Sequence, residues 1–431
     1  MQAALLAGVQ SGCGKTSVML AMLQALARTA SLTAFKAGPD FLDPLWHQAV
    51  TGQLSYNLDT RMMGESACRE LLHRTKTEQV LVEGVMGMFD GKSGVGEAGS
   101  SADLARVLAM PVWLVVNAKG MSGSIVALVS GFVAQAEKIG VRISGIIANQ
   151  VGSAHHASLL KDFLDDHELP PLLAWMEKNA PVLPERHLGL QRPEEVALPD
   201  FSSCFHLDTE RLPAAWGEIK RTESIPEASR QYLKNKTIAI ARDAACCFCY
   251  PANLDWLQAQ GAALEFFSPL AGEPVPDNAD ALWLPGGYPE LYAQTLSTSA
   301  TLSSIRNFIE TSQPVLAECG GMMILGKALI DHAGHHWPMA NALPIISRMQ
   351  DRLAGLGYRE SETGARGHEF HHSVREQDEN IAGAFNVSRG DKGLHYKKLR
   401  ASYIHWYFPS APEEAASWFG AEADINKEAA A

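Results

Sequence analysis

The chain has 431 residues, of which 46% are hydrophobic and 19% charged, so it is long enough for two or three domains with their own cores. Its formal net charge of −12 argues against nucleic acid as the main partner, because binding to a phosphate backbone requires a basic face. The seven cysteines show no paired framework, which is typical of a reducing compartment. The N-terminus leaves no room for a signal peptide, and no apolar run approaches the about 20 residues that span a bilayer. We therefore expect a cytoplasmic protein with no membrane partner.

The start of the chain predicts a short strand, a glycine-rich turn and a helix that opens at Gly-Lys-Thr. In such a turn, backbone N–H groups close around phosphate oxygens, and the helix adds its positive N-terminal end. Gly12 and Gly14 form the turn, Lys15 can reach the β- and γ-phosphates, and the Thr16 hydroxyl can bind Mg²⁺. Five residues separate Gly8 from Gly14, one more than in the common pattern, and this longer loop resembles that of dethiobiotin synthetases and partition ATPases. An ordinary glycine-rich turn is the alternative, but the Lys-Thr pair favours nucleotide binding.

Up to about residue 165 the sequence alternates between strand-like and helix-like runs. Apolar strands are predicted at 32–35, 80–82, 112–116 and 143–148, and helices at 61–74, 101–108, 122–138 and 155–166. This alternation predicts a parallel sheet with helices on both faces, which binds its ligand at the carboxyl ends of the strands.

Acidic residues follow two of these strands. Asp40 and Asp43 lie between prolines, where they can coordinate Mg²⁺ or orient a water and a substrate acid. Glu83 stands at a strand end, where an acid completes the metal site of P-loop enzymes, and Asp90 follows in the same loop. Each could be a solvated loop acid, but four acids on two loops of the predicted active edge favour a joint role. Asn149, also at a strand end, could bond an adenine or merely terminate the strand.

The segment 208–235 lacks an apolar period and is rich in polar residues and proline, so we predict a linker between domains of residues 1–207 and 236–431. A surface excursion within one domain is the alternative. A second alternating series follows, with strands at 237–241, 264–267, 281–284 and 314–317 and helices at 253–260 and 303–311. Beyond about residue 355 the runs are shorter and more strand-like, as in an added sheet.

The strand at 314–317 runs into Cys319, two glycines and a helix, which is the pattern of a nucleophile elbow. The tight turn exposes the sulfur to a helix N-terminus, so we expect the pKa of the Cys319 thiol to be lowered toward a thiolate. Gly286 and Gly287 follow the strand before it and could supply amides for an oxyanion hole. His405 is the best-placed candidate for the base among fifteen histidines, with a structural histidine as the alternative.

Three cysteines at 246, 247 and 249 could suggest a metal site, but no second cysteine pair has ligand spacing. We favour the edge of an apolar pocket there. The histidine-rich segments 332–336 and 367–372 are interpreted as pocket or surface residues.

Taken together, the motifs resemble the cobyrinate a,c-diamide synthase family, which includes the hydrogenobyrinate enzymes. The resemblance rests on segments that follow the family's order along nearly the whole chain: 8–16, 35–44, 57–59, 82–91, 184–190, 285–290 and 318–321. It implies an α/β chain, with an N-terminal P-loop NTPase domain built on a dethiobiotin synthetase-like parallel sheet. The C-terminal domain would be an α/β domain like those of class I, triad-type glutamine amidotransferases.

The resemblance implies an ATP- and Mg²⁺-dependent ligase of vitamin B12 synthesis. Ammonia, from L-glutamine or free in solution, would displace phosphate from acyl phosphates formed at the a and c side chains of cobyrinate or hydrogenobyrinate. The resemblance gives catalytic roles to Asp40, Asp43, Asp90, Cys319 and His405, ATP contacts to Lys15 and Thr16, metal binding to Thr16, Asp40 and Glu83, and positions near the macrocycle to Phe41 and Leu42. The residue patterns described above add Gly12, Gly14 and Asn149 as expected ATP contacts, and Gly286 and Gly287 as expected contacts of the substrate. A homodimer is compatible with this assignment.

Ordinary class I amidotransferases carry His-Pro-Glu, whereas here Trp406 and Tyr407 follow His405, so we predict a Cys–His dyad. Family members commonly have Tyr-Ile where this chain has Phe41 and Leu42.

Two other hypotheses about the function stay open beside this assignment. Cobyric acid synthases carry a loop like Phe-Lys-Ala-Gln-Asn, which differs from residues 35–40 here. The second hypothesis is a P-loop ATPase switch with an inactive amidotransferase domain. The intact residues 318–321 argue against it.

Overall fold

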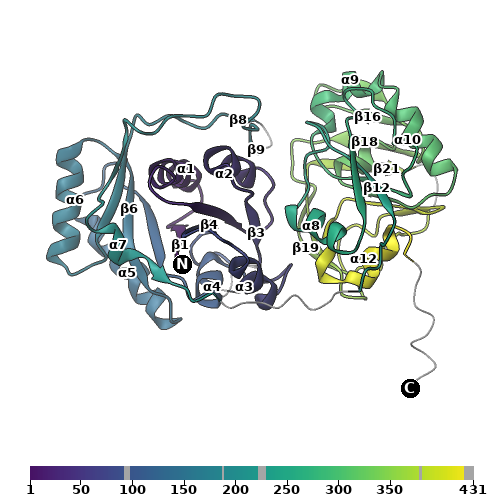
Figure 1. Cartoon of the computed structure of the whole chain (residues 1–431). Coiled ribbons are helices and arrows are strands. Elements are labelled where there is room, and N and C mark those ends of the chain that lie inside the picture. The colour runs from purple at the N-terminus through teal and green to yellow at the C-terminus, as the bar shows by residue number, and fades with distance from the viewer. Residues whose placement is uncertain (92–97, 187–188, 222–229, 378–380, 422–431) are drawn as a thin grey trace. The chain divides into compact units, whose positions relative to one another are not determined.

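The computed structural model describes residues 1–91, 98–186, 189–221, 230–377 and 381–421, shown as coloured ribbon in Figure 1. The chain divides into two compact units, Met1–Ile225 and Pro226–Ala431. Within the described ranges, no helix combines the length and the apolar character needed to cross a membrane.

Nine strands of the described part of the first unit form one sheet, in the order β10-β7-β6-β5-β1-β4-β2-β3 with β11 beside β1. The strands are β1 (Gln2–Gly8), β2 (Leu32–Ala37), β3 (Tyr56–Leu58), β4 (Gln79–Gly87), β5 (Val112–Asn117), β6 (Ile143–Val151), β7 (Leu172–Glu177), β10 (Phe205–Leu207) and β11 (Gly217–Glu218). β1 to β7 are parallel, and β10 and β11 are antiparallel to their neighbours. The carboxyl ends of β1, β2 and β4 therefore meet at one edge, as the alternating pattern predicted.

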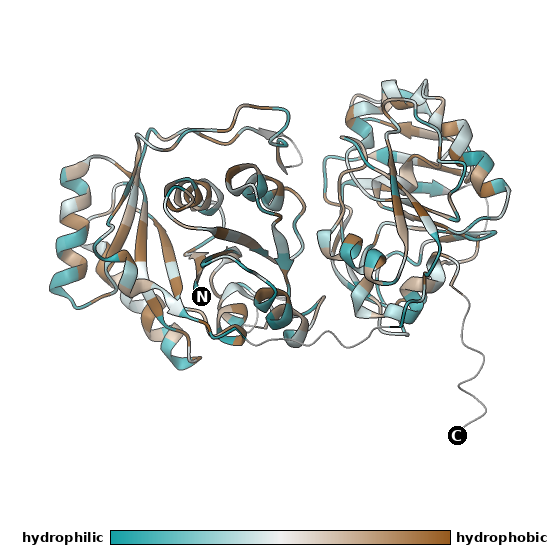
Figure 2. Cartoon of the chain, in the orientation of Figure 1, coloured by the Kyte–Doolittle hydropathy of each residue, from teal (hydrophilic) through white to brown (hydrophobic). Residues whose placement is uncertain are grey.

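Helices cover both faces of this sheet. They are α1 (Lys15–Leu26), α2 (Asp43–Thr51), α3 (Glu65–His73), α4 (Ser101–Val107), α5 (Ser124–Lys138) and α6 (Ala154–Asp166). Figure 1 shows α1 and α2 on one face and α3 and α4 on the other. Strands β5 and β6 are hydrophobic along much of their length, whereas α6 is largely hydrophilic (Figure 2), because parallel strands are buried on both faces and an outer helix on only one.

Part of the predicted linker forms regular structure. Residues 212–215 form helix α7 (Leu212–Ala215), and β11 pairs with the start of β1. The Trp216 ring packs edge-to-face on that of Trp113, with centroids 4.5 Å apart, and Ala215 accepts a hydrogen bond from the Trp113 indole. Elements of two to four residues are too short to show an apolar period, which is why a polar composition concealed them. Residues 222–229 of the predicted linker lie outside the described part.

In the described part of the second unit, a six-stranded sheet has the order β13-β12-β14-β15-β23-β22. The strands are β12 (Thr237–Ala241), β13 (Ala263–Phe267), β14 (Ala281–Leu284), β15 (Val315–Glu318), β22 (Leu394–Tyr396) and β23 (Leu399–Ser402), and the helices include α8 (Pro251–Ala259), α9 (Ala293–Ser297), α10 (Thr301–Glu310) and α12 (Pro412–Trp418). All neighbours are parallel except β22 and β23. The turns that follow β14 and β15 therefore meet at one edge.

The described part of this unit also holds two smaller sheets, and four of their seven strands lie from residue 355 on, where strand-rich structure was predicted. One has the order β17-β16-β18-β21 and the other β19-β20-β24. Their strands are β16 (Ala328–Ile330), β17 (His336–Pro338), β18 (Ile345–Met349), β19 (Gly355–Glu360), β20 (Arg366–His371), β21 (Ser373–Gln377) and β24 (His405–Tyr407). The second of these sheets carries His405 at the start of β24.

Candidate active sites

The first site begins at the turn between β1 and α1. Gly12 and Gly14 have φ values of 74° and 88°, a region that glycine adopts without strain. A Cβ atom on Gly14 would lie 2.1 Å from the Asn149 side-chain nitrogen. That nitrogen donates a hydrogen bond of 2.9 Å to the Cys13 carbonyl. Asn149 thus supports the phosphate-binding turn from β6, while its predicted contact with adenine stays a prediction.

A buried cluster of charges lies beside this turn. The Lys36 Nζ atom lies 2.5 Å from Asp43 Oδ2 and 3.2 Å from Glu83 Oε1, and all three side chains are at least nine-tenths buried. The Thr16 hydroxyl donates a 2.7 Å hydrogen bond to Glu83 Oε1. The structure therefore brings together Thr16, Asp43 and Glu83 from three separate segments, as expected for strand ends that share one edge.

Charges within the cluster compensate the cost of burial. Burial lowers the pKa of Lys36, but the Asp43 and Glu83 carboxylates outweigh it and raise that pKa above its usual value. Burial raises the pKa of Glu83, but Lys36 and His47 reverse the effect and lower it to about 2. Burial and the neighbouring carboxylates of Asp40 and Glu83 raise the pKa of Asp43, against the opposing effect of Lys36. Glu83 is therefore the carboxylate of the cluster that is held firmly ionised.

His47 belongs to this cluster and was missed in the sequence. Its Nε2 atom lies 2.8 Å from Glu83 Oε2, and its Nδ1 atom lies 3.0 Å from the Ser55 hydroxyl. His47 follows Asp43 by four residues on α2, so the two project from the same helix face. That spacing was the available signal.

Asp40 and Asp90 hold loops at the same edge. Asp40 Oδ1 accepts hydrogen bonds of 2.9 Å from the backbone N–H groups of Leu42 and Asp43. It thereby fixes the start of α2 and the position of the preceding Phe41. Asp90 Oδ2 accepts a 2.9 Å hydrogen bond from Gly87 N. The catalytic roles of Asp40 and Asp90, and the substrate contacts of Phe41 and Leu42, stay predictions.

The oxygens at this edge fit a magnesium ion. Mg²⁺ is usually held by one or two carboxylates together with phosphate oxygens and water. Thr16 and Glu83 offer a hydroxyl and an ionised carboxylate next to the phosphate-binding turn, with Asp40 on the neighbouring loop. In the described ranges, no three His, Cys, Asp or Glu side chains are grouped to hold a metal by themselves, the cysteines at 246–249 included.

The second site begins at Cys319, which forms the sharp turn that the sequence predicted. Its φ of 45° and ψ of −111° are strained for a residue with a side chain, and β15 ends directly before it. A Cβ on Gly320 would lie 2.7 Å from Pro289 Cδ, and one on Gly321 would lie 2.1 Å from the Leu284 carbonyl oxygen. Only glycines allow this close approach, so the nucleophile elbow is confirmed as a backbone feature.

Gly286 brings the thiol and the imidazole together. A Cβ atom on Gly286 would lie 2.3 Å from His405 Cε1 and 3.3 Å from Cys319 Cβ. The Gly286 carbonyl also accepts a 2.9 Å hydrogen bond from Phe248 N. Gly287 packs against residue 245, because its Cβ would lie 2.1 Å from the Ala245 oxygen. The Cys319–His405 arrangement is thus built around a glycine, while the oxyanion role of Gly286 and Gly287 stays a prediction.

The expected activation of the resting thiol is wrong. Burial, together with the Glu290 carboxylate, raises the pKa of the Cys319 thiol to about 12. Helix α11 (Gly320–Met323) has only four residues and offers a weak positive end. Burial and the neighbouring His368 lower the pKa of His405 well below its usual value. The resting pair is therefore a neutral thiol beside a neutral imidazole.

Two further residues support the Cys319–His405 pair, and the sequence did not predict their roles. Glu318 Oε1 accepts a 2.8 Å hydrogen bond from Trp406 N, and Glu318 Oε2 accepts a 3.1 Å hydrogen bond from the Trp283 indole. Glu318 therefore joins the strand before Cys319 to the strand that carries His405. The His368 ring stacks on that of His405, and its position in a histidine-rich segment was the available signal.

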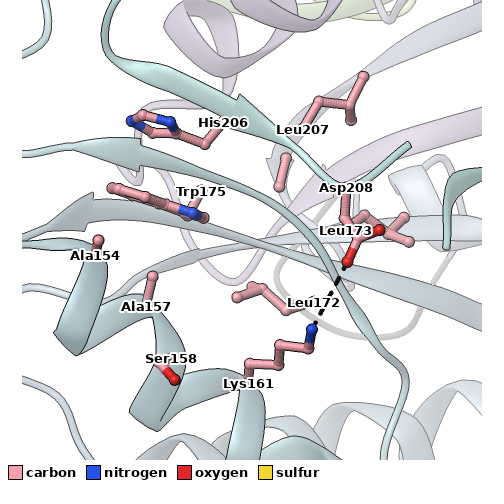
Figure 3. A pocket seen from close by; sticks show the side chains of 11 residues that line it. Ala154, Ala157, Ser158, Lys161, Leu172, Leu173, Trp175, His206, Leu207 and Asp208 are labelled. Carbon is pink, nitrogen blue, oxygen red and sulfur yellow. Dashed lines mark ion pairs between the residues drawn. The ribbon is translucent and has the colours of Figure 1, made fainter. Parts of the chain in front are cut away.

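A separate pocket of about 370 Å³ lies between α6 and the strands β7 and β10 (Figure 3). The His206 ring stacks on Trp175 at 3.8 Å, and Lys161 forms a 4.0 Å ion pair with Asp208. The eleven residues that line this pocket include none of the predicted site residues. The reactive groups therefore lie elsewhere, at the loop edges of the two large sheets.

Comparison with known proteins gives two matching family models. Residues 4–189 match the CobQ/CobB/MinD/ParA nucleotide binding domain, and residues 237–413 match the CobB/CobQ-like glutamine amidotransferase domain. The cobyrinate a,c-diamide synthase of Herminiimonas arsenicoxydans is 40% identical, over 97% of this chain and 96% of that protein. The hydrogenobyrinate a,c-diamide synthase of Brucella abortus is 38% identical, over 94% of this chain and 98% of that protein. The chain therefore belongs to the family of the cobyrinate and hydrogenobyrinate a,c-diamide synthases.

Proposed function

We propose that this protein is an ATP- and glutamine-dependent ligase that converts the a and c side-chain carboxylates of cobyrinate into amides. The observation that carries the proposal is the pairing, in one chain, of a phosphate-binding site with a thiol–imidazole site. One site can activate a carboxylate and the other can release ammonia. Because each chemistry needs the other to yield an amide, the pair is best explained as one reaction.

In the first unit, Lys15 and the turn amides hold the phosphates of ATP, and Thr16 and Glu83 hold Mg²⁺. The ion supplies charge neutralisation for the transferred phosphoryl group. A macrocycle carboxylate attacks the γ-phosphorus, ADP leaves, and an acyl phosphate remains. Ammonia then attacks the acyl carbon and phosphate departs. Lys36 is placed among the acids to offset negative charge as this phosphate forms.

In the second unit, Cys319 Sγ attacks the side-chain amide carbon of glutamine. His405 accepts the thiol proton and transfers it to the departing nitrogen, so that ammonia leaves and a thioester remains. Water then cleaves the thioester to glutamate and restores the thiol. Both groups are neutral at rest, so the thiol proton passes to His405 in the course of the attack.

Cobyrinate and hydrogenobyrinate a,c-diamide synthases both match nearly the full chain. Hydrogenobyrinate is therefore the second candidate substrate. The test is incubation with ATP, Mg²⁺ and glutamine, with each macrocycle offered separately and acid-to-amide exchanges counted by mass spectrometry. Two exchanges on one macrocycle are expected and identify the substrate. ATP hydrolysis with no exchange on either would overturn the proposal.

The Cys319→Ala variant separates the two half-reactions. Glutamine-dependent amidation should fall by at least about 10³-fold, because no thioester can form. Amidation with ammonium chloride should be unchanged, because the first unit is intact. Cys204→Ala removes a buried cysteine of the first unit and should keep both activities. Loss of ammonia-dependent amidation in Cys319→Ala alone would contradict the division of labour.

A further inference from the structure

In an ordinary class I amidotransferase, an acid two residues after the catalytic histidine orients the imidazole. Tyr407 occupies the position two residues after His405. The buried carboxylate of Glu318 accepts a hydrogen bond from the backbone N–H of Trp406, the residue after His405. Because a phenol stands at the acid's position, we look for another feature of the fold that sets the plane of the imidazole.

The neighbouring strand supplies such a feature. In the antiparallel pairing of β20 with β24, His368 lies directly opposite His405. The two rings are stacked, with centroids 5.1 Å apart and planes within 22°. The Phe248 ring also packs on His405, edge-on at 5.9 Å, and Gly286 lies against its Cε1 atom. Contacts from three segments therefore fix the orientation of the His405 ring.

His368 is itself held by a tyrosine. The Tyr250 hydroxyl lies 2.9 Å from His368 Nδ1. Tyr250 precedes α8, and its ring packs against that of Tyr407 at 6.4 Å. All these side chains are buried, with His405 2%, Tyr250 3% and His368 5% exposed. The chain of contacts from Tyr250 through His368 to His405 is rigid because every member is enclosed.

We infer that His368, anchored by Tyr250, is a positioning residue for His405 and replaces the orienting acid of other class I amidotransferases. This inference rests on the proposed hydrolysis of glutamine at Cys319. His368 acts through its ring face, which fixes the plane of the His405 ring as His405 takes the thiol proton.

The charges around His368 agree with this role. Burial, with a contribution from Arg359, lowers the pKa of His368 to about 3. Arg359 is paired with Glu369, so its charge is compensated. His371 also has a pKa lowered by burial, and it stacks on Tyr403. His368 therefore stays neutral and adds no positive charge beside the imidazolium that His405 becomes.

The test compares glutamine hydrolysis by the full chain and three variants. His368→Ala should lower kcat by up to about 100-fold with KM nearly unchanged, because the base is misplaced and not the substrate. His368→Phe keeps a ring at the same place and should restore most of kcat. Tyr250→Phe should lower kcat by roughly fivefold, through loss of one hydrogen bond. The exposed His395 provides a control, and His395→Ala should behave as the parent protein.

The pH profile adds a readout that a merely structural role would not move. In His368→Ala, water enters beside His405, so the acidic limb of kcat/KM should shift to higher pH, and His368→Phe should keep the parental limb. Unchanged kcat in His368→Ala would overturn the inference, as would a His368→Phe variant as slow as His368→Ala. Ammonia-dependent amidation should survive in every variant. If the parent protein hydrolyses no glutamine, the proposed function fails as well.

Discussion

Lys36 is the buried cation of the charge cluster at the strand ends of the first unit. Asp43 and Glu83 both contact its ammonium group, and hardly any of the three side chains reaches solvent. Taking these charges out of water is costly, and only their mutual attraction repays it. A cluster of this kind is weak evidence for stability, so its presence at the strand ends agrees with a role in chemistry.

Replacing Lys36 should therefore destabilise the first unit. Lys36→Met removes the cation and leaves two buried carboxylates, at a cost of about 3–5 kcal/mol in the free energy of unfolding. Lys161→Met breaks only the half-exposed 4.0 Å pair with Asp208 and should cost at most about 1 kcal/mol. Urea titrations of the full chain would measure the free energy of unfolding of both variants. Proteolysis with and without nucleotide would then report on the first unit separately. Equal stability of the two variants would contradict the compensation of buried charge.

The elbow and the loop after β14 act as one element. Gly286, Gly320 and Gly321 each lie where a Cβ atom would meet a neighbour at less than 3.0 Å. Because of these close approaches, the ends of β14 and β15 and the start of β24 lie near one another, and the Cys319 thiol and the His405 imidazole are neighbours. The requirement is steric, so even the smallest side chain should disturb it.

Gly286→Ala should separate His405 from Cys319. The added methyl would lie 2.3 Å from His405 Cε1, so the ring must move, and glutamine hydrolysis should fall by about 100-fold. Ammonia-dependent amidation should persist. Gly131→Ala is the control, because no atom lies within 4 Å of the added carbon in α5 and alanine favours the helix by about 0.5–1 kcal/mol. Full glutaminase activity in Gly286→Ala would contradict this prediction, because it would show that the loop shifts to accommodate the methyl group.

At the scale of the whole molecule, buried titratable groups set the pH range in which the second unit is stable. His368 and His405 stay neutral when folded, with pKa values below the usual 6.5, but bind protons when unfolded. Stability is therefore lost as the pH falls below about 6.5. Glu318 acts oppositely: burial raises its pKa to about 8, so the folded chain holds a proton that the unfolded chain releases above about 4.5. Its contribution is lost as the pH rises toward 8.

Between pH 4.5 and 6.5 the two histidines outweigh the one glutamate, so the stability of the second unit should peak near pH 6.5. Calorimetry of the full chain from pH 5 to 8 would measure the shift of its transition. Glu318→Gln should flatten the limb above pH 6.5. It should also cost about 1–3 kcal/mol, because an amide nitrogen cannot accept one of the two hydrogen bonds from Trp406 and Trp283. A stability that rises steadily to pH 8 in the parent protein would contradict the assignment.

Patterns that are local in sequence predicted both large sheets and the outline of each site. The phosphate-binding turn, the acids after β2 and β4 and the glycines around Cys319 could all be identified in this way. Each depends on a few adjacent residues whose backbone needs are fixed by chemistry: glycine for a tight turn, lysine for phosphate, cysteine between a strand and a helix. Short elements such as α7 and β11 escaped because two to four residues carry no period.

The sequence by itself determined the fold class, the order of the two units and the candidate site residues, among them Lys15, Thr16, Glu83, Cys319 and His405. Only the tertiary structure decided the electrostatic state of those groups and the residues behind them. His47 meets Glu83 across 36 positions of the chain, and His368 meets His405 across 37. The pKa of Cys319 rises because folding removes water from the thiol and brings Glu290 near it. Burial and long-range contact arise from packing between elements, so no local pattern of residues encodes them visibly.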